Sequence, residues 1–218
     1  MTFEKWSFFV NILLMTLLST NQTLYIVLAT IALLVVLCLL VFLGYREFYE
    51  RKHIRELTYF KLSHLCEKND YLLLNEYQIA IDDRNNGVID HIVISDKYII
   101  LINDFAISGV LSGDYQSEGL YNTTKKGTKV VANPINYNIN LTKRLCLFND
   151  LDHTLIKGLV VINNDSEVKL TNTNEQFQII RRKDLAKTIK KFDKENVKKL
   201  NEKSIVKFIN YLNEHNGL

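Results

Sequence analysis

The chain has 218 residues and a formal net charge of +3, a length typical of one globular domain with an appendage. This charge is too small to indicate a nucleic-acid partner by itself. The three cysteines form no CxxC pair and have no histidine at zinc-ligand spacing, so the sequence predicts neither a zinc site nor a disulfide framework. One proline and many Asn, Lys and Ile residues are typical of an AT-rich bacterial genome.

The N-terminal region is the first feature in chain order, and it predicts a membrane anchor over residues 1–45. No charged residue occurs from Trp6 to Tyr45. A spanning helix needs about 20 apolar residues, and we place one over 24–44. Four cations follow closely: Arg46, Arg51, Lys52 and Arg55. Cationic flanks stay on the inner side, so we expect residues 46–218 to face the cytoplasm at the cell membrane.

The segment over 6–19 is apolar but short. One straight helix over the whole uncharged stretch would be about 60 Å long, twice the hydrocarbon thickness. We therefore expect a break near 19–23. Two arrangements remain open, a second short span that forms a hairpin with the first and a helix that lies in the interface. The sequence leaves one and two transmembrane helices as alternatives.

Hydrophobic periodicity predicts an α/β domain with a mixed central β-sheet flanked by helices. Helices are expected over 46–68, 135–149, 183–192 and 204–215, and strands over 71–80, 88–95, 98–104, 129–132, 155–164 and 177–182. A turn is expected over 82–87. Neither GxGxxG nor GxxxxGK[ST] occurs, which argues against a dinucleotide or P-loop site.

Several short stretches in this domain follow one another in a recognisable order. They are RELTYF (55–60), IDHIVIS (89–95), IILINDF (99–105), AISG (106–109) and NPINYN (133–138). Together they resemble the NERD (nuclease-related) domain, a branch of the restriction-endonuclease-like PD-(D/E)XK nucleases, over about residues 54–190. The resemblance implies a restriction-endonuclease-like fold.

The same resemblance implies a magnesium-dependent site with two strand carboxylates, a lysine and a helix acid. Glu56 matches the helix acid and Asp90 the first strand acid, which makes them vestigial catalytic candidates. Asn103 stands where the second acid belongs, Phe105 stands at the lysine position, and Tyr137 replaces a helix glutamine. An amide has no charge and a phenyl group has no proton to give, so we expect a degenerate site with no cofactor.

Asp104 is the alternative second acid. Successive strand residues point to opposite faces, so a regular strand aims Asp104 away from Asp90 unless a β-bulge near 103–105 turns it back. In an active enzyme, Asp90 and Asp104 would be the metal ligands for magnesium. Lys125, Lys126 and Lys143 are candidate nucleic-acid-binding residues, whereas the basic run over 181–203 contains acids and is typical of a solvated helix face.

Three functions follow from these observations. We expect a membrane-anchored NERD-like pseudoenzyme that binds DNA, RNA or other membrane-complex proteins at the inner membrane face. The first alternative is an active magnesium-dependent nuclease that uses Asp90, Glu56 and a re-aimed Asp104. The second is a structural membrane subunit without nucleic-acid contact.

Overall fold

A computed structural model describes residues 3–80, 86–149 and 151–215 and divides the chain into two compact units, Met1–Tyr49 and Glu50–Leu218. The turn expected over 82–87 lies mostly outside the described residues. The helices are α1 (Phe3–Lys52), α2 (Ile54–Asn69), α3 (Pro134–Asn149), α4 (Leu185–Asp193) and α5 (Glu202–His215). The strands are β1 (Leu72–Ala80), β2 (Asn86–Ile94), β3 (Ile99–Asp104), β4 (Val110–Asp114), β5 (Gly119–Thr124), β6 (Gly127–Ala132), β7 (Ile156–Ile162), β8 (Glu167–Thr171) and β9 (Phe177–Arg181).

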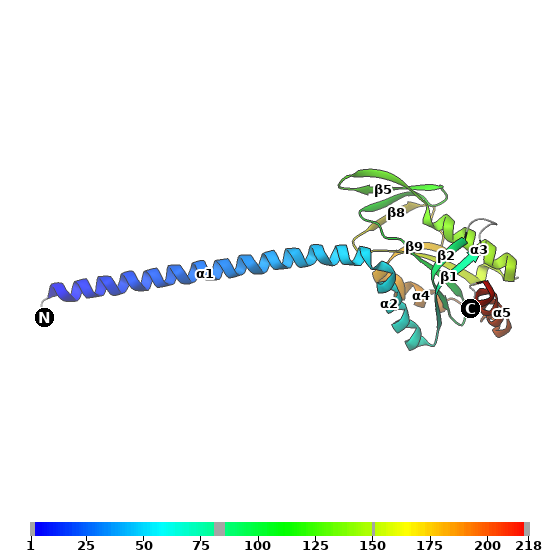
Figure 1. Cartoon of the computed structure of the whole chain (residues 1–218), viewed down its shortest axis with the longest axis horizontal. Helices are drawn as coiled ribbons and strands as arrows, with labels where there is room; N and C mark the ends of the chain where they lie inside the picture. Colours follow the sequence, from blue (N-terminus) through cyan, green and yellow to red (C-terminus); the bar gives the residue numbers. More distant parts are fainter. Residues whose placement is uncertain (1–2, 81–85, 150, 216–218) are drawn as a thin grey trace. The chain divides into compact units, whose positions relative to one another are not determined.

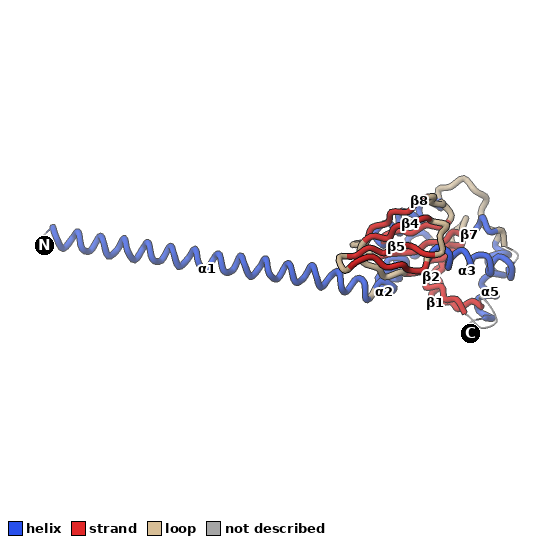
Figure 2. The backbone as a smooth tube through the Cα atoms, turned by 90° about the horizontal axis from the view of Figure 1, so that it is seen from above, coloured by secondary structure: helices blue, strands red, loops and turns tan. Residues whose placement is uncertain are grey.

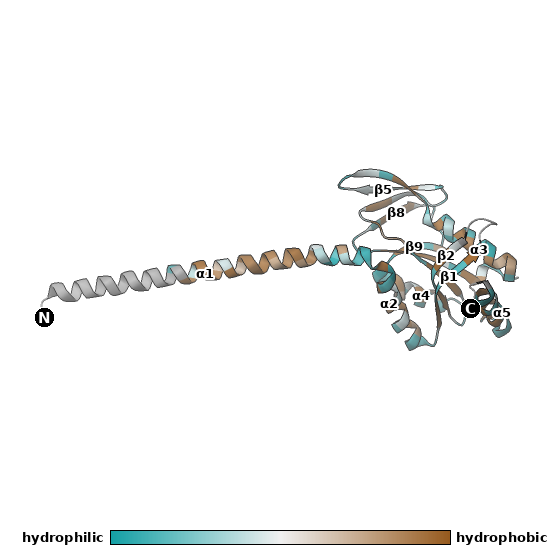
Figure 3. Ribbon diagram, viewed as in Figure 1, coloured by the Kyte–Doolittle hydropathy of each residue, from teal (hydrophilic) through white to brown (hydrophobic). Residues whose placement is uncertain are grey.

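Helix α1 is continuous, and the break expected near 19–23 is wrong. The reason is local, because the sequence from 3 to 43 contains neither glycine nor proline and single Asn and Gln residues do not end a helix. Its stretch Leu24–Lys52 is long and apolar enough to cross a membrane by length and composition. Figure 3 shows apolar residues along the second half of α1, followed by polar residues in its last turns.

The second unit is built on a five-stranded mixed sheet with the order β1-β2-β3-β7-β9 (Figures 1 and 2). Strands β1, β2 and β3 are antiparallel neighbours, and β7 and β9 continue parallel to β3. The strands predicted over 88–95 and 98–104 are therefore confirmed as β2 and β3. All seven residues of β7 are buried, as expected for a strand covered on both faces.

Helices cover both faces of this sheet. Helices α2 and α4 pack on one face through a cluster that includes Leu62, Ile102 and Phe192. Helices α3 and α5 pack on the other through a cluster that includes Leu141 and Phe208. All core clusters of the described residues draw on the second unit alone, so we expect this unit to fold without α1.

A second, four-stranded sheet with the order β6-β5-β4-β8 was not predicted. The stretch expected as a polar loop with one short strand is the β5–β6 hairpin, and β4 and β8 were missed. Gly109 precedes β4 with φ +87°, and a Cβ there would lie 2.1 Å from the Thr123 carbonyl oxygen. Only glycine allows β4 to start at this position against β5.

Candidate functional site

The candidate site lies where the pairing of β2 with its two neighbours becomes irregular. Glu76 has a left-handed backbone with φ +56°, and the β1–β2 pairing passes from Asn75–His91 to Tyr77–Ile89 without pairing Glu76. The β2–β3 pairing ends at His91. Asp90 therefore leaves the regular ladder, and both Asp90 and the next residue, His91, reach toward α2.

Asp90 is buried, with only 6% of its side chain exposed, and Arg55 of α2 supplies its countercharge. The Arg55 Nη2 atom lies 2.6 Å from Asp90 Oδ1, and the Asp104 backbone N–H donates to Oδ2 at 2.8 Å. Burial raises the pKa of Asp90, while the Asp104 N–H and the Arg55 guanidinium oppose this rise. The Arg55 guanidinium and the Asp104 N–H thus offset part of the desolvation cost of the Asp90 carboxylate.

Asp104 is equally enclosed, with a side-chain exposure of 2%. Its Oδ1 accepts from the Thr58 hydroxyl at 2.6 Å, and its Oδ2 lies 3.0 Å from His91 Nε2. The other ring nitrogen of His91 lies 2.7 Å from Asn75 Oδ1. We expected a bulge over 103–105 to be needed for Asp104 to join Asp90, but β3 pairs regularly with β7 through Asp104. The irregularity beside the acids lies instead in the pairing of β1 with β2, at Glu76 and Asp90.

These two acids do not fit a divalent cation. Mg²⁺ needs several free oxygen ligands around one point. All four carboxylate oxygens of Asp90 and Asp104 already have protein partners, and the nearest cation is the Arg55 guanidinium. Within residues 3–80, 86–149 and 151–215, no group of three or more His, Cys, Asp or Glu side chains could hold a metal.

Two of the altered positions form a structural network of their own. The Asn103 side-chain amide donates to the Val88 carbonyl at 2.8 Å. The Tyr137 hydroxyl of α3 donates to the same carbonyl at 3.0 Å and accepts from the Val88 N–H at 2.7 Å. These bonds satisfy the backbone of β2 just beyond the point where its pairing with β3 ends. Asn103 and Tyr137 thus stabilise the strand end.

Phe105 packs against the apolar cluster that fills the space between the two sheets, beside residues such as Ile107 and Leu120. At this position the phenyl group contributes to the core. Lys97, a possible substitute for the missing lysine, donates instead to the Asp193 and Glu195 carbonyls.

Glu56, expected to complete the site, lies apart from the two strand acids. Its side chain is 63% exposed, and its Oε2 lies 2.9 Å from His53 Nδ1. It lines an open pocket of about 460 Å³ together with Arg55, Tyr59, Phe60, Asn75, Glu76 and His91. The helix residue that does reach the buried acid is the next one back, Arg55.

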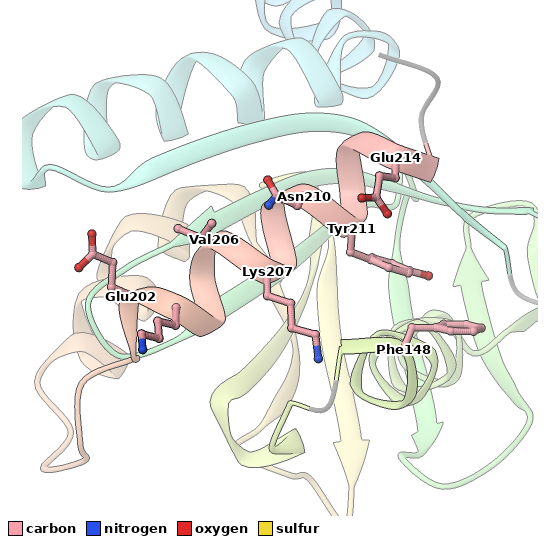
Figure 4. Close-up of a pocket in the computed structure, with 8 residues that line it drawn as sticks. Phe148, Glu202, Val206, Lys207, Asn210, Tyr211 and Glu214 are labelled. Carbon is pink, nitrogen blue, oxygen red and sulfur yellow. The ribbon is translucent and has the colours of Figure 1, made fainter.

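The candidate nucleic-acid-binding lysines are exposed but occupy different elements. Lys125 and Lys126 form the tip of the β5–β6 hairpin, and the six residues of β6 separate them from the start of α3. Lys143 lies nine residues into α3. A further hollow of about 670 Å³ lies along α5 beside Phe148 (Figure 4). This hollow is on the sheet face opposite α2 and includes none of the predicted site residues.

Comparison with known proteins adds the family. The family model of the nuclease-related domain, NERD, matches residues 50–163, more than half of the chain. The chain belongs to the NERD family. No curated protein and no solved structure matched it. The match runs from α2 through β7 and so contains both strand acids, whereas the resemblance was expected to extend to residue 190.

Sequence reasoning missed Arg55 and Thr58 as site residues. Both lie on α2, three residues apart, and so on one helix face. Arg55 directly precedes Glu56 in the sequence, but it was interpreted only as part of the basic segment that follows the apolar stretch. Both residues belong to the stretch RELTYF that carries part of the NERD resemblance, but the resemblance gave a role only to Glu56.

Proposed function

We propose that this NERD protein is a membrane-anchored binding module at the inner membrane face, and that its nuclease-like site does not cut nucleic acid. The observation that carries the proposal is the closed set of contacts around Asp90 and Asp104. Arg55 supplies a positive charge beside Asp90, as a metal ion would in a nuclease, and Thr58 and His91 contact Asp104.

The replaced residues support the same conclusion. Water activation and charge stabilisation at a phosphate need a bound cation and a nearby lysine. Phe105 is a partly buried apolar residue packed against the core, and the Asn103 side-chain NH₂ donates to a backbone carbonyl. Reversing one substitution alone would therefore not rebuild the site, since the neighbouring residues are packed for their present roles.

Anchoring rests on the apolar stretch of α1. Residues 24–44 would cover about 30 Å as a helix, which matches the hydrocarbon core of a bilayer. The cations that follow favour a cytoplasmic location for the second unit. Alkaline extraction of membranes from expressing cells tests this part, because a spanning chain stays in the pellet and a peripheral chain is released.

The cutting activity is tested with residues 50–218 and with the full chain. Single- and double-stranded DNA and RNA are incubated with Mg²⁺ or Mn²⁺, and binding is followed by gel shift. We expect binding without cleavage, and weaker binding in a K125Q/K126Q/K143Q variant. Metal-dependent cleavage that Asp90→Ala abolishes in a folded domain would overturn the proposal.

One observation favours a second candidate, an active nuclease. Asp90 and Asp104 do lie side by side, as that alternative requires. The alternative needs Arg55 to leave Asp90, which its 53% exposed side chain permits. It predicts that Arg55→Ala gains metal-dependent cleavage, whereas the binding module predicts no gain.

A further inference from the structure

Much of the positive charge of the second unit lies in α4 and in the residues that flank it. Residues 181–194 contain seven Lys and Arg residues and two Asp residues, while the whole chain has a formal net charge of only +3. The remainder of the chain is therefore slightly negative. This asymmetry points to an anionic partner for α4 rather than to general solubility.

Three exposed lysines of α4 and the residue that caps its C-terminus form one cluster, and we name them the lysine face: Lys187, Lys190, Lys191 and Lys194. Their spacing of three and four residues places them side by side, and together with Ala186 they line an open hollow of about 550 Å³. Lys191 lies 3.3 Å from Glu175. In the part of the chain that the structure describes, the other three have no acidic partner.

The opposite face of α4 is committed to the core. Leu185, Ile189 and Phe192 are fully buried against α2 and the five-stranded sheet. The helix therefore cannot insert an apolar face into another surface. Any partner of the lysine face has to bind through charge alone.

The start of α4 is fixed beside the point where the chain enters the second unit. Glu50, 6% exposed, accepts from Arg182 Nη2 at 2.9 Å and from the Asn164 N–H at 3.0 Å. Lys61 Nζ donates to the Arg182 and Lys183 carbonyls at 2.6 and 2.7 Å. These contacts hold the residues just before α4 to Glu50 and to Lys61 of α2.

The uncharged stretch ends at Tyr45, only five residues before Glu50. Five residues reach at most about 17 Å, whatever the orientation of the two units. If α1 spans the membrane, as the proposed function holds, Glu50 lies within this distance of the headgroups. Arg182 contacts the Glu50 side chain and therefore also stays near the headgroups. The lysine face begins at Lys187, five residues after Arg182.

We propose that the lysine face of α4 binds the anionic headgroups of the membrane to which the chain is anchored. The lysine face is about 10 Å long, too short to follow a nucleic-acid strand beyond a few phosphates. None of the described residues that line its hollow is aromatic, whereas proteins that bind single strands stack bases on aromatic side chains. Binding to a layer of anionic headgroups requires clustered positive charge near the membrane surface and no extended groove.

The test uses residues 50–218, so that it does not depend on α1. Vesicles of phosphatidylcholine alone and of phosphatidylcholine with phosphatidylglycerol are sedimented with the domain. We expect binding to the anionic vesicles only, and loss of binding at 0.5 M salt. In K187Q/K190Q/K194Q we expect partitioning to fall by about fivefold per lysine, on the order of 100-fold in all.

The matched control K129Q/K203Q/K207Q removes the same charge from other exposed positions and should change partitioning by less than about threefold. Thermal unfolding checks that both variants are folded. Equal binding to neutral vesicles, equal loss in the control, or a lysine-face variant that loses DNA binding but keeps vesicle binding would each overturn the proposal. Failure of membrane extraction for the full chain would overturn the anchor without changing this result.

Discussion

Replacing Arg55 by methionine tests whether its guanidinium is the cation of the site. The substitution keeps most of the side-chain volume and removes the charge that lies 2.6 Å from Asp90 Oδ1. Removing one partner from a buried ion pair costs about 3–5 kcal/mol. Arg55 is 53% exposed and partly screened by water, so we discount this to about 2 kcal/mol at pH 7. For a domain of this size, that is a fall in melting temperature of about 4–8 °C.

The pH dependence of this loss identifies Asp90 as its source. Burial raises the pKa of Asp90 in the folded state above its unfolded value of about 3.9. Between the unfolded and folded pKa values, the folded state binds the Asp90 proton more tightly than the unfolded state does. The free energy of unfolding therefore falls as pH rises through this range. Because the Arg55 charge lowers the pKa of Asp90, its loss raises the folded pKa of Asp90 further and widens this pH range. The Arg55→Met deficit should therefore shrink toward zero as pH falls to about 4.

The assay is thermal and chemical unfolding of residues 50–218 between pH 4 and pH 8, for wild type, Arg55→Met, Asp90→Asn and the double variant. Asp90→Asn removes the buried charge and should change stability by less than about 1 kcal/mol, because Arg55 returns to water. In the Asp90→Asn background, Arg55→Met should cost less than about 0.5 kcal/mol. A deficit that is unchanged by pH, or by loss of the Asp90 charge, would refute the reasoning.

Three further predictions concern neighbouring residues. Thr58→Val should destabilise the domain by about 1–3 kcal/mol in urea unfolding, because the buried Asp104 carboxylate loses a hydroxyl donor. Thr58→Ser keeps the hydroxyl and should retain most of the stability. An equal loss of stability in both variants would contradict this hydrogen bond. Tyr137→Phe should cost about 1 kcal/mol and speed hydrogen exchange at the Val88 amide, and unchanged exchange would argue against this network. Gly109→Ala should cost about 3 kcal/mol or more, because a Cβ at φ +87° meets a backbone carbonyl, and a neutral effect would contradict the position of β4.

The fold was predictable where the signal was long or strongly apolar. Strands β2, β3 and β7 are buried β-branched runs, and α3 begins at the chain's single proline. The second sheet was missed because β4 and β8 have only five residues each and mix polar with apolar side chains. Such short segments resemble loops in composition, and only pairing with a distant strand makes them strands.

The residues at the candidate site could be located from the sequence, but their contacts could not. Asn103 and Phe105 were identified from their spacing after Asp90, yet the irregular pairing at Glu76 leaves no sequence signal, because a left-handed Glu is set by tertiary packing. Arg55 lies 35 residues before Asp90 and meets it only once α2 packs on the sheet. Interactions of this range depend on the fold rather than on local pattern.

The central claim is that protein groups occupy the place of a catalytic metal between Asp90 and Asp104. The most direct measurement is an anomalous difference map from crystals of residues 50–218 soaked in MnCl₂. We predict no peak near either carboxylate and an Arg55 guanidinium in contact with Asp90. A manganese peak about 2.0–2.6 Å from oxygens of both acids, with Arg55 displaced, would contradict the account.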